Sequence, residues 1–286
     1  MILIADSGST KTDWAFVDDN REVSVVKTQG INPVHQNAET IRTILKEELM
    51  AQAPEAATFS AVYYYGSGVR PTEEALMEQL LREALGATRV EAKSDLLGAA
   101  RALCGHEEGI ACILGTGANS CLFNGEHIVL NTPPLGYILG DEGSGAVLGK
   151  ELLNALYKGV LPTELREAFE SECGMTLADV VERVYRRPLA NRFLASLSPF
   201  IHSHLHVPAM QMLVVDSLRS FVRRNVAPYG RADLLLSAVG SIAYYYEEQL
   251  RQAAKEEGHA LGRVERSPLQ ALVAYHTDPD VATVGE

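Results

Sequence analysis

The sequence contains no long run of apolar or of basic residues. A membrane-spanning helix needs roughly 18 consecutive apolar residues, and no stretch of this chain approaches that length, so we expect no membrane partner. The basic runs are pairs such as Arg186-Arg187, and 25 Lys and Arg stand against 37 Asp and Glu, a formal net charge of −12. Nucleic-acid backbones need clustered cations, so we also expect no nucleic-acid partner.

Cysteine is scarce and badly spaced for metal binding. The four cysteines, Cys104, Cys112, Cys121 and Cys173, form no Cys-x-x-Cys pair, so we expect no zinc or iron–sulfur site within one chain. Cys112 and Cys121 lie in apolar runs, which is typical of small buried residues. The first residues, Met1 to Asp6, show neither a charged leader nor a cleavage site, which favours a cytoplasmic protein.

Three common catalytic motifs are also missing. The nearest approach to a P-loop, Ser144 to Glu151, has Ser in place of the first Gly and Glu in place of the last hydroxyl residue. No Gly-x-Gly-x-x-Gly turn joins a strand to a helix, and no Gly-x-Ser-x-Gly elbow surrounds Ser144. A nucleotide or ester substrate would therefore need another kind of site.

Strands alternate with helices along the chain, which predicts an α/β fold, and the length of 286 residues predicts one large or two medium domains. Apolar runs and turn residues predict strands over residues 2–5, 13–17, 23–27, 60–65, 90–92 and 233–239. Helical periodicity predicts helices over residues 38–50, 72–85, 96–103, 149–157, 163–172, 176–185, 192–206, 210–227, 243–256 and 267–276.

The opening pattern recurs in the middle of the chain. At an offset of 109 residues, Gly8 aligns with Gly117, Ser7 with Thr116, Thr10 with Asn119 and Trp14 with Phe123. Each copy is an apolar strand, a turn rich in glycine and hydroxyl groups, and a second strand. The repeat predicts two lobes related by duplication.

Both turns carry the chemistry of a phosphate site. In the first, Gly8 permits a close backbone approach, Ser7, Ser9 and Thr10 offer hydroxyl donors, and Lys11 offers a charge. Asp6, at the end of the strand, is a candidate Mg²⁺ ligand through water. The second turn offers Gly115, Thr116, Gly117 and Ala118. The alternative is that both are ordinary hairpin turns, for which the same residue types suffice.

Other polar residues allow two interpretations each. Asp95 follows Ser94 and precedes an apolar helix, so it is either a helix cap or a general base for a hydroxyl group. The acidic turn from Gly140 to Gly145 either binds sugar hydroxyls or a metal, or only precedes a helix. His202 and His206 are four residues apart, and a helix surface is a simpler interpretation than a zinc site.

On these residues the chain resembles the actin-like ATPase and sugar-kinase superfamily, and within it the BadF/BadG/BcrA/BcrD-type ATPases that include the N-acetylglucosamine kinases. The resemblance covers nearly the whole length, in the order Asp6–Thr12, Ser94-Asp95, Gly115–Asn119, Gly140–Ser144 and Ala238–Ser241. It implies an α/β, ribonuclease H-like fold with duplicated lobes around a cleft for ATP and Mg²⁺. The implied domains are residues 1–107, completed by a C-terminal helix in 267–286, and residues 108–266.

The resemblance also implies residue roles. Asp95 would be the base, Thr10 and Thr116 would contact phosphates, and Gly240 with Ser241 would lie near the adenosine. The implied sugar contacts are Asn32, Ala118, Asn119, Gly136 and Asp141. Two departures bear on which sugar is bound: Pro134-Leu135-Gly136 stands where the family often has Gly-Trp-Gly, and Ser94 stands where Asn is common.

The leading hypothesis is an ATP-dependent kinase that phosphorylates an amino sugar, N-acetylglucosamine, at its 6-hydroxyl. One alternative is an actin-like ATPase that acts as a nucleotide-dependent regulator or activator of a partner protein. Another is a sugar-binding module that has lost phosphoryl transfer. The sequence leaves open whether the chain forms a homodimer.

Overall fold

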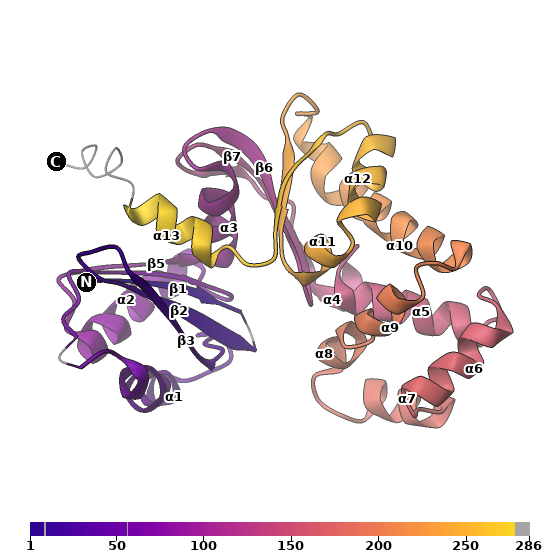
Figure 1. Ribbon diagram of the computed structural model, residues 1–286, viewed down its shortest axis with the longest axis horizontal. Coiled ribbons are helices and arrows are strands. Elements are labelled where there is room, and N and C mark those ends of the chain that lie inside the picture. The colour runs from indigo at the N-terminus through magenta and orange to yellow at the C-terminus, as the bar shows by residue number, and fades with distance from the viewer. Residues whose placement is uncertain (9, 56, 278–286) are drawn as a thin grey trace. The chain divides into compact units, whose positions relative to one another are not determined.

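The protein is described from a computed structural model that covers residues 1–8, 10–55 and 57–277 (Figure 1). The chain divides into two compact units. Unit 1 comprises Met1–His106, Gly125–His127 and the described part of Ser267–Glu286, and unit 2 comprises Glu107–Asn124 and Ile128–Arg266. No helix among the described residues has the length and apolar character of a membrane span.

Unit 1 is a five-stranded mixed sheet with helices on both faces. Its strands are β1 (Ile2–Ser7), β2 (Lys11–Val17), β3 (Val23–Gln29), β4 (Ala61–Gly66) and β5 (Arg89–Ser94), in the order β3-β2-β1-β4-β5. Its helical segments are α1 (Ala38–Thr43), η1 (Ile44–Leu49), η2 (Met50–Gln52), α2 (Pro71–Leu85), α3 (Asp95–Cys104) and α13 (Leu269–Thr277). The first three strands are antiparallel, and β1, β4 and β5 are parallel.

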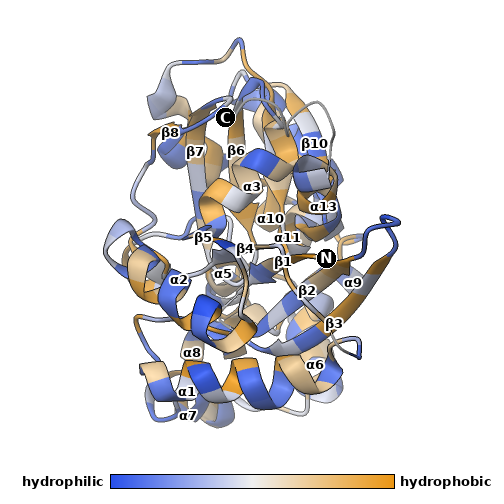
Figure 2. Ribbon diagram, turned by 90° about the vertical axis from the view of Figure 1, so that its left-hand side faces the viewer, coloured by the Kyte–Doolittle hydropathy of each residue, from blue (hydrophilic) through white to orange (hydrophobic). Residues whose placement is uncertain are grey.

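The two faces of this sheet are buried by different helices, because alternate side chains of a strand point to opposite faces. One face carries Leu3, Ala5, Trp14 and Phe16 and packs with residues of α1, η1 and α2. The other face carries Ile4, Ala15, Tyr63 and Tyr65 and packs with residues of α3 and α13. Figure 2 shows blue and orange residues along α2, as expected of a helix with only one face on a core.

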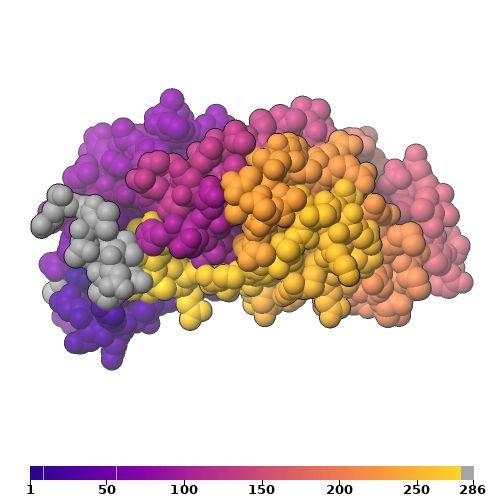
Figure 3. Space-filling model, turned by 90° about the horizontal axis from the view of Figure 1, so that it is seen from above, coloured from indigo at the N-terminus to yellow at the C-terminus, as the bar shows by residue number. Residues whose placement is uncertain are grey.

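The C-terminal helix α13 packs against α3 and the first two strands of unit 1. In Figure 3 the yellow atoms of this C-terminal segment lie beside purple and magenta atoms from earlier in the chain. Tyr65 Oη lies 2.7 Å from His276 Nε2, and the His276 ring stacks on Tyr63. Burial lowers the pKa of His276 to about 3, with Arg101 and Arg89 acting in the same direction, so the ring is neutral at pH 7.

Unit 2 repeats the sheet of unit 1 and adds more helices. Its strands are β6 (Glu108–Leu114), β7 (Ala118–Asn124), β8 (Ile128–Leu130), β9 (Leu236–Val239) and β10 (Leu261–Glu265), in the order β10-β9-β6-β7-β8. Its helices are α4 (Gly136–Leu139), α5 (Gly145–Tyr157), α6 (Thr163–Glu172), α7 (Leu177–Tyr185), α8 (Ala190–Ala195), α9 (Ser198–Ser203), α10 (Pro208–Phe221), η3 (Val222–Val226), η4 (Ala227–Tyr229), α11 (Ser241–Tyr245) and α12 (Glu247–Glu256).

The two sheets have the same strand order and the same strand directions, with β6 to β10 in the places of β1 to β5. The predicted duplication is therefore confirmed at the level of topology. The predicted offset of 109 residues is wrong. Aligned on their last cross-strand pairs, Ser7–Thr12 and Leu114–Ala118, the hairpins have an offset of 107 in the first strand and 106 in the second. The second turn is one residue shorter, and glycine and hydroxyl residues fit several positions of such turns.

Other differences concern element boundaries. The helix expected over residues 192–206 is two short helices, α8 and α9, and the one expected over 243–256 is divided at Tyr246 between α11 and α12. The strand expected over 233–239 begins only at Leu236, because the residues before it form a turn in which the amide of Leu234 donates to the carbonyl of Arg231 at 3.2 Å. The strands β8 and β10 and the short helix α4 were not predicted.

Candidate active site

The first glycine-containing turn of unit 1 joins β1 to β2. The amide of Gly8 donates to the carbonyl of Lys11 at 3.0 Å and closes the turn. Ser7 is fully buried, and its hydroxyl lies 2.7 Å from Thr12 Oγ1 and 3.2 Å from the carbonyl oxygen of Ile31. The Ser7 hydroxyl therefore has a structural role, and the exposed Gly8, Thr10 and Lys11 remain the residues open to a ligand. Ser9 lies outside the described residues.

The charge of Lys11 is fixed by a buried carboxylate that the sequence interpretation missed. Asp13 is only 6% exposed, and its Oδ2 lies 2.5 Å from Lys11 Nζ. Lys27 Nζ lies 3.9 Å from Asp13 Oδ1. The signal was present in the sequence, because a charged residue at a buried position of a strand needs a partner and lysines stand two and fourteen residues away.

The carboxyl group of Asp6 is electrostatically coupled to those of Asp13 and Asp95. It lies opposite Asp13 in the β1–β2 ladder and beside Tyr65 in the β1–β4 ladder. Burial raises the pKa of Asp6 to about 7, and the charges of Asp95 and Asp13 act in the same direction. The hydroxyl of Ser267 donates to Asp6 Oδ2 at 3.3 Å and partly opposes this rise. A cation bound here would relieve the repulsion among the three carboxylates.

Asp95 stands at the first position of α3. The cap of this helix is Ser94, whose Oγ accepts from the amide of Leu97 at 3.2 Å, so the interpretation of Asp95 as the cap is wrong. Asp95 Oδ1 accepts from the amide of Leu96 at 2.8 Å. Burial raises the pKa of Asp95, and the backbone amides of Leu96 and Asp95 partly oppose this effect. A partly buried carboxylate with a raised pKa is suited to accept a proton.

Asn32 is held in a fixed orientation by its neighbours. The side-chain Oδ1 of Asn32 accepts from the backbone amide of Val34 at 3.0 Å, and the backbone N–H of Asn32 donates to Gln36 Oε1 at 2.7 Å. Gly68, with φ of +81°, packs directly on it: a Cβ at Gly68 would lie 2.2 Å from Asn32 Oδ1. Gly68 therefore shapes this position, and the Gly66-Ser-Gly68 sequence at the end of β4 was its signal.

In unit 2 the shorter turn joins β6 to β7 and is tied to α5. The amide of Gly115 donates to the carbonyl of Gly117 at 2.9 Å. The carbonyls of Gly115 and Thr116 accept from the amides of Gly145 and Ala146 at 2.8 and 3.2 Å. The first amides of α5 are therefore used to hold the turn, a role that spacing alone did not indicate.

Asp141 lies beside this turn. It has φ of +54°, and a Cβ at Gly117 would lie 3.1 Å from its Oδ2. Burial raises the pKa of Asp141 to about 6, opposed by the backbone amide of Ala118. The structure thus brings Gly117, Ala118 and Asp141 together. Asn119 Oδ1 accepts from Asn131 Nδ2 at 2.9 Å.

Two further predicted residues of unit 2 are glycines with positive φ. Gly136 has φ of +73° and begins α4. Gly240 has φ of +120°, and a Cβ there would lie 2.2 Å from the carbonyl oxygen of Leu114, the residue before the turn. Only glycine fits such a position. Gly240 and Ser241 therefore lie next to the turn that begins at Gly115.

A zinc site at the histidines is not formed. Helix α9 ends at Ser203, so His202 and His206 do not share a helix. Their spacing of four residues therefore does not place the two side chains on one helix face. Within the described ranges no group of three or more His, Cys, Asp or Glu residues is close enough to hold a metal ion by itself.

Comparison with solved structures gives matches over nearly the whole chain. A putative N-acetylglucosamine kinase from Porphyromonas gingivalis is 49% identical, with a TM-score of 0.94 and coverage of 98% of this chain and 100% of that one. A putative N-acetylglucosamine kinase from Chromobacterium violaceum is 19% identical, with a TM-score of 0.72 and coverage of 96% and 98%. A ROK family glucokinase from Streptomyces griseus, solved with glucose and AMPPNP, is 16% identical, with a TM-score of 0.57 and coverage of 96% and 97%.

The two matches of lower identity bear on the fold alone, and they confirm the predicted α/β, two-lobed actin-like architecture. Neither the family models nor the curated proteins contain a match to this chain.

Proposed function

The chain belongs to the same sugar-kinase family as the Porphyromonas gingivalis protein, and we propose from this that it is an ATP-dependent kinase of an amino sugar, N-acetylglucosamine. The observation that carries the proposal is 49% identity over essentially the whole of both chains. The match covers 98% of this chain and 100% of that one with a TM-score of 0.94, so it spans both units.

We propose Asp95 as the general base. The reaction joins the acceptor hydroxyl oxygen to the γ-phosphorus, breaks the bond from that phosphorus to the bridging oxygen of ADP, and releases one proton from the hydroxyl. The carboxylate of Asp95, with its pKa raised by burial, would take this proton. Its Oδ1 already accepts the Leu96 amide, which fixes the orientation of the carboxyl group.

Phosphate binding is proposed for the two turns. In unit 1 the exposed Gly8, Thr10 and Lys11 would supply an amide, a hydroxyl and a charge, with Asp13 holding Lys11 in place. In unit 2 the turn from Gly115 to Gly117 would supply donors around Thr116. Gly240 and Ser241 would lie near the adenosine.

The residues of unit 1 fit a magnesium ion. Carboxylate oxygens are the ligands that Mg²⁺ prefers, and it commonly takes only one or two of them, with water and substrate phosphates completing its coordination. Asp6, surrounded by the charges of Asp13 and Asp95, would hold it. When bound, the ion would neutralise charge on the phosphates.

For the sugar we propose contacts from Asn32 in unit 1 and from Ala118, Asn119, Gly136 and Asp141 in unit 2. The fixed amide of Asn32 and the carboxyl group of Asp141 are suited to hydroxyl and acetamido groups. Three finer assignments also remain proposals: membership of the BadF/BadG/BcrA/BcrD branch, domains at 1–107 with 267–286 and at 108–266, and a cytoplasmic location.

The test is ADP release from ATP in the presence of single sugars: N-acetylglucosamine, its 2-epimer, glucosamine, glucose and no sugar. We expect N-acetylglucosamine to increase the rate at least tenfold over the sugar-free rate. Phosphorus and proton NMR of the product should place the phosphate on the 6-hydroxyl. Equal ADP release with every sugar and without sugar, together with measurable ATP binding, would instead identify a nucleotide-dependent regulator and overturn the assignment as a kinase.

A further inference from the structure

Two asparagines of unit 2 contact each other through their side chains: Asn119 on β7 and Asn131, the residue after β8. Asn119 Oδ1 accepts from the backbone N–H of Ser120 at 2.9 Å and from Asn131 Nδ2 at 2.9 Å. A backbone N–H can only donate, so the atom of the Asn119 amide that faces it is the oxygen. Both lone pairs of this oxygen are then in use, and the two N–H groups of Asn119 Nδ2 are what the side chain can offer to a ligand.

The orientation of the Asn131 amide is fixed by the same reasoning. Its Nδ2 donates to the carbonyl oxygen of Ser120 at 2.7 Å and to that of Thr132 at 3.1 Å. A carbonyl oxygen can only accept, so the nitrogen of the Asn131 amide, and not its oxygen, must face these two atoms. The same nitrogen reaches Asn119 Oδ1. Asn131 therefore holds the Asn119 amide in one of its two orientations.

The residues that follow the two asparagines, Ser120 and Thr132, are held by the same two partners. Ser120 Oγ and Thr132 Oγ1 donate to the carbonyl oxygen of Asn225 at 2.9 and 3.0 Å. The hydroxyl of Tyr229 lies 2.7 Å from Ser120 Oγ and accepts from the N–H of Thr132 at 3.1 Å. Because the Ser120 proton is used on Asn225, Tyr229 donates to Ser120. Burial raises the pKa of Tyr229, which keeps the donated proton on its hydroxyl.

This network is buried, and it extends to the residue beside another proposed sugar contact. Ser120 is fully buried, and Asn225 and Tyr229 are 5% and 8% exposed. Asn225 Nδ2 also donates to Glu142 Oε2 at 3.1 Å, and Glu142 follows Asp141 in the chain. A buried network whose donors have acceptors holds its members in one arrangement. The amide of Asn119 is therefore oriented before any ligand arrives.

We propose that Asn131 is a positioning residue that sets sugar specificity: it holds the Asn119 amide with its nitrogen toward the substrate, and the sugar group bound there is an oxygen that accepts a hydrogen bond. The inference rests on the proposed function, in which Asn119 contacts the sugar. An asparagine that is free to turn can donate or accept, whereas Asn119 can only donate. A sugar without an acceptor at this position is rejected, because the Asn119 N–H groups would lose water and gain no partner.

Asn131→Asp tests the direction of this hydrogen bond. The variant keeps the size of the side chain but places a carboxylate oxygen where Nδ2 faced acceptor oxygens, so it favours an Asn119 amide whose nitrogen is turned toward residue 131. The Kd for N-acetylglucosamine, measured by isothermal titration calorimetry with and without AMPPNP, should rise at least about tenfold. The KM for the sugar should rise by the same factor, with kcat and the KM for ATP within about threefold of the unchanged protein.

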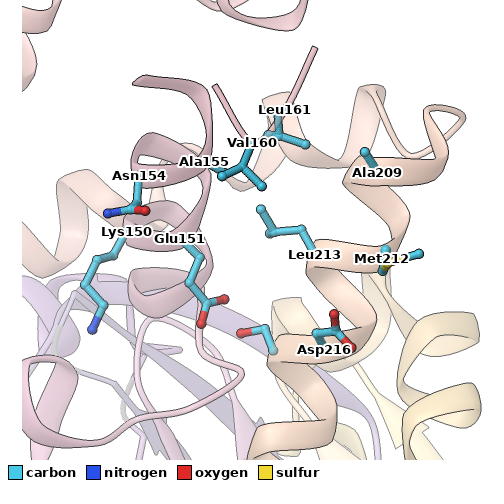
Figure 4. Close-up of a pocket in the computed structure, with 11 residues that line it drawn as sticks. Lys150, Glu151, Asn154, Ala155, Val160, Leu161, Ala209, Met212, Leu213 and Asp216 are labelled. Carbon is cyan, nitrogen blue, oxygen red and sulfur yellow. The ribbon is translucent and has the colours of Figure 1, made fainter. Parts of the chain in front are cut away.

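Asn131→Ala separates orientation from simple support. It removes the donor without adding an acceptor, and the Ser120 N–H still holds Asn119 Oδ1, so the Kd should rise only about threefold. A purely structural role would make this truncation at least as harmful as Asn131→Asp, and that order of effects would overturn the proposal. The matched control is Asn154→Asp, the same change at an exposed position of α5 (Figure 4), which should leave the Kd unchanged.

A double-mutant cycle shows whether Asn131 acts through Asn119. In the Asn119→Ala background, Asn131→Asp should change the Kd by less than about twofold, and Asn131→Ala takes its place should that variant fail to fold. An undiminished effect in this background would refute the positioning role. Equal affinity for N-acetylglucosamine in Asn131→Asp and the unchanged protein would overturn the inference and leave the kinase standing. No binding of the sugar by the unchanged protein would overturn the proposed sugar, and this inference with it.

Discussion

The two units share one scaffold but carry different chemistry on it. In both, an antiparallel hairpin is followed by a third antiparallel strand, and two parallel strands complete the sheet. One step before the last cross-strand pair, unit 1 has Asp6 opposite Asp13, and unit 2 has Ile113 opposite Asn119. The two scaffolds are alike, but only unit 1 has carboxylates at this position. The fold thus provides the turns, and the residues beside them decide what each turn can bind.

The turns differ in how they are supported as well. In unit 1 the support comes from side chains: the Ser7 and Thr12 hydroxyls bond beneath the turn, and Asp13 holds Lys11. In unit 2 it comes from backbone, because the carbonyls of Gly115 and Thr116 accept the first amides of α5. Substitutions should therefore affect chemistry most in unit 1 and stability most in unit 2.

The largest effect is expected at Asp95 in unit 1. Asp95→Asn keeps the size of the side chain and removes the proton acceptor, so kcat should fall by roughly 10²–10⁴-fold. The Kd for ATP should stay within a few fold. The measurements are sugar-stimulated ADP release and calorimetric titration with ATP. The control is Asp19→Asn, the same change at an exposed position. Near-normal turnover in the Asp95 variant would eliminate it as the base.

A loss of stability is expected at Gly240 in unit 2. An alanine there would take φ of +120° and overlap the carbonyl of Leu114, which should cost about 3 kcal/mol of unfolding free energy. Gly258 also has positive φ, at +82°, but nothing lies within 4 Å of its Cβ position, so Gly258→Ala should cost about 1 kcal/mol. Urea unfolding measures the free energy of unfolding of both variants. Equal losses would mean that the close approach of residue 240 to Leu114 does not contribute to stability.

A smaller, pH-dependent effect is expected at Asp141 in unit 2. Its pKa rises from 3.8 to about 6 on folding, so the folded state binds more protons between these values. The free energy of unfolding should therefore fall as the pH rises from about 4 to about 6. Asn tolerates the positive φ of this position, and Asp141→Asn should remove that decrease.

Relative to the unchanged protein, Asp141→Asn should be about 1–2 kcal/mol more stable at pH 8 and equally stable near pH 4. The control is Glu248→Gln, an exposed charge change in the same unit. Urea midpoints at the two pH values measure the difference. A stability gain that is the same at both would show that burial of the Asp141 charge is not its cause.

The smallest effect is expected on the pKa of Asp6, which lies opposite Asp13 in unit 1. Removing the charge in Asp13→Asn should lower the pKa of Asp6 below about 7, because like charges raise the pKa of an acid. Carbon-detected NMR titration of the Asp6 carboxyl group measures it, with Asp19→Asn as the control. An unchanged pKa would mean that Asp6 and Asp13 are not electrostatically coupled and that burial and the Asp95 charge set the pKa of Asp6.

Sequence reasoning reached the repeat but not its register. The apolar strands and glycine-rich turns predicted two related hairpins, because strand and turn preferences are local. The correct alignment depends on which residues pair across each hairpin, and the one-residue difference in turn length is invisible to composition. The start of α3 is a second example. The residue types identified Asp95 as a candidate, but which of Ser94 and Asp95 caps the helix depends on the exact residue at which the helix begins, and the structure places Ser94 there.

The sequence by itself determined the α/β alternation, the two-fold repeat and the set of acidic, hydroxyl and glycine residues available for phosphate chemistry, since these follow from local patterns. Only the tertiary structure decided that Asp6, Asp13 and Asp95 share one electrostatic environment, that Gly240 must lie against Leu114, and that His276 stacks on Tyr63. Each of these depends on chain segments far apart in sequence, and packing alone brings such segments within reach.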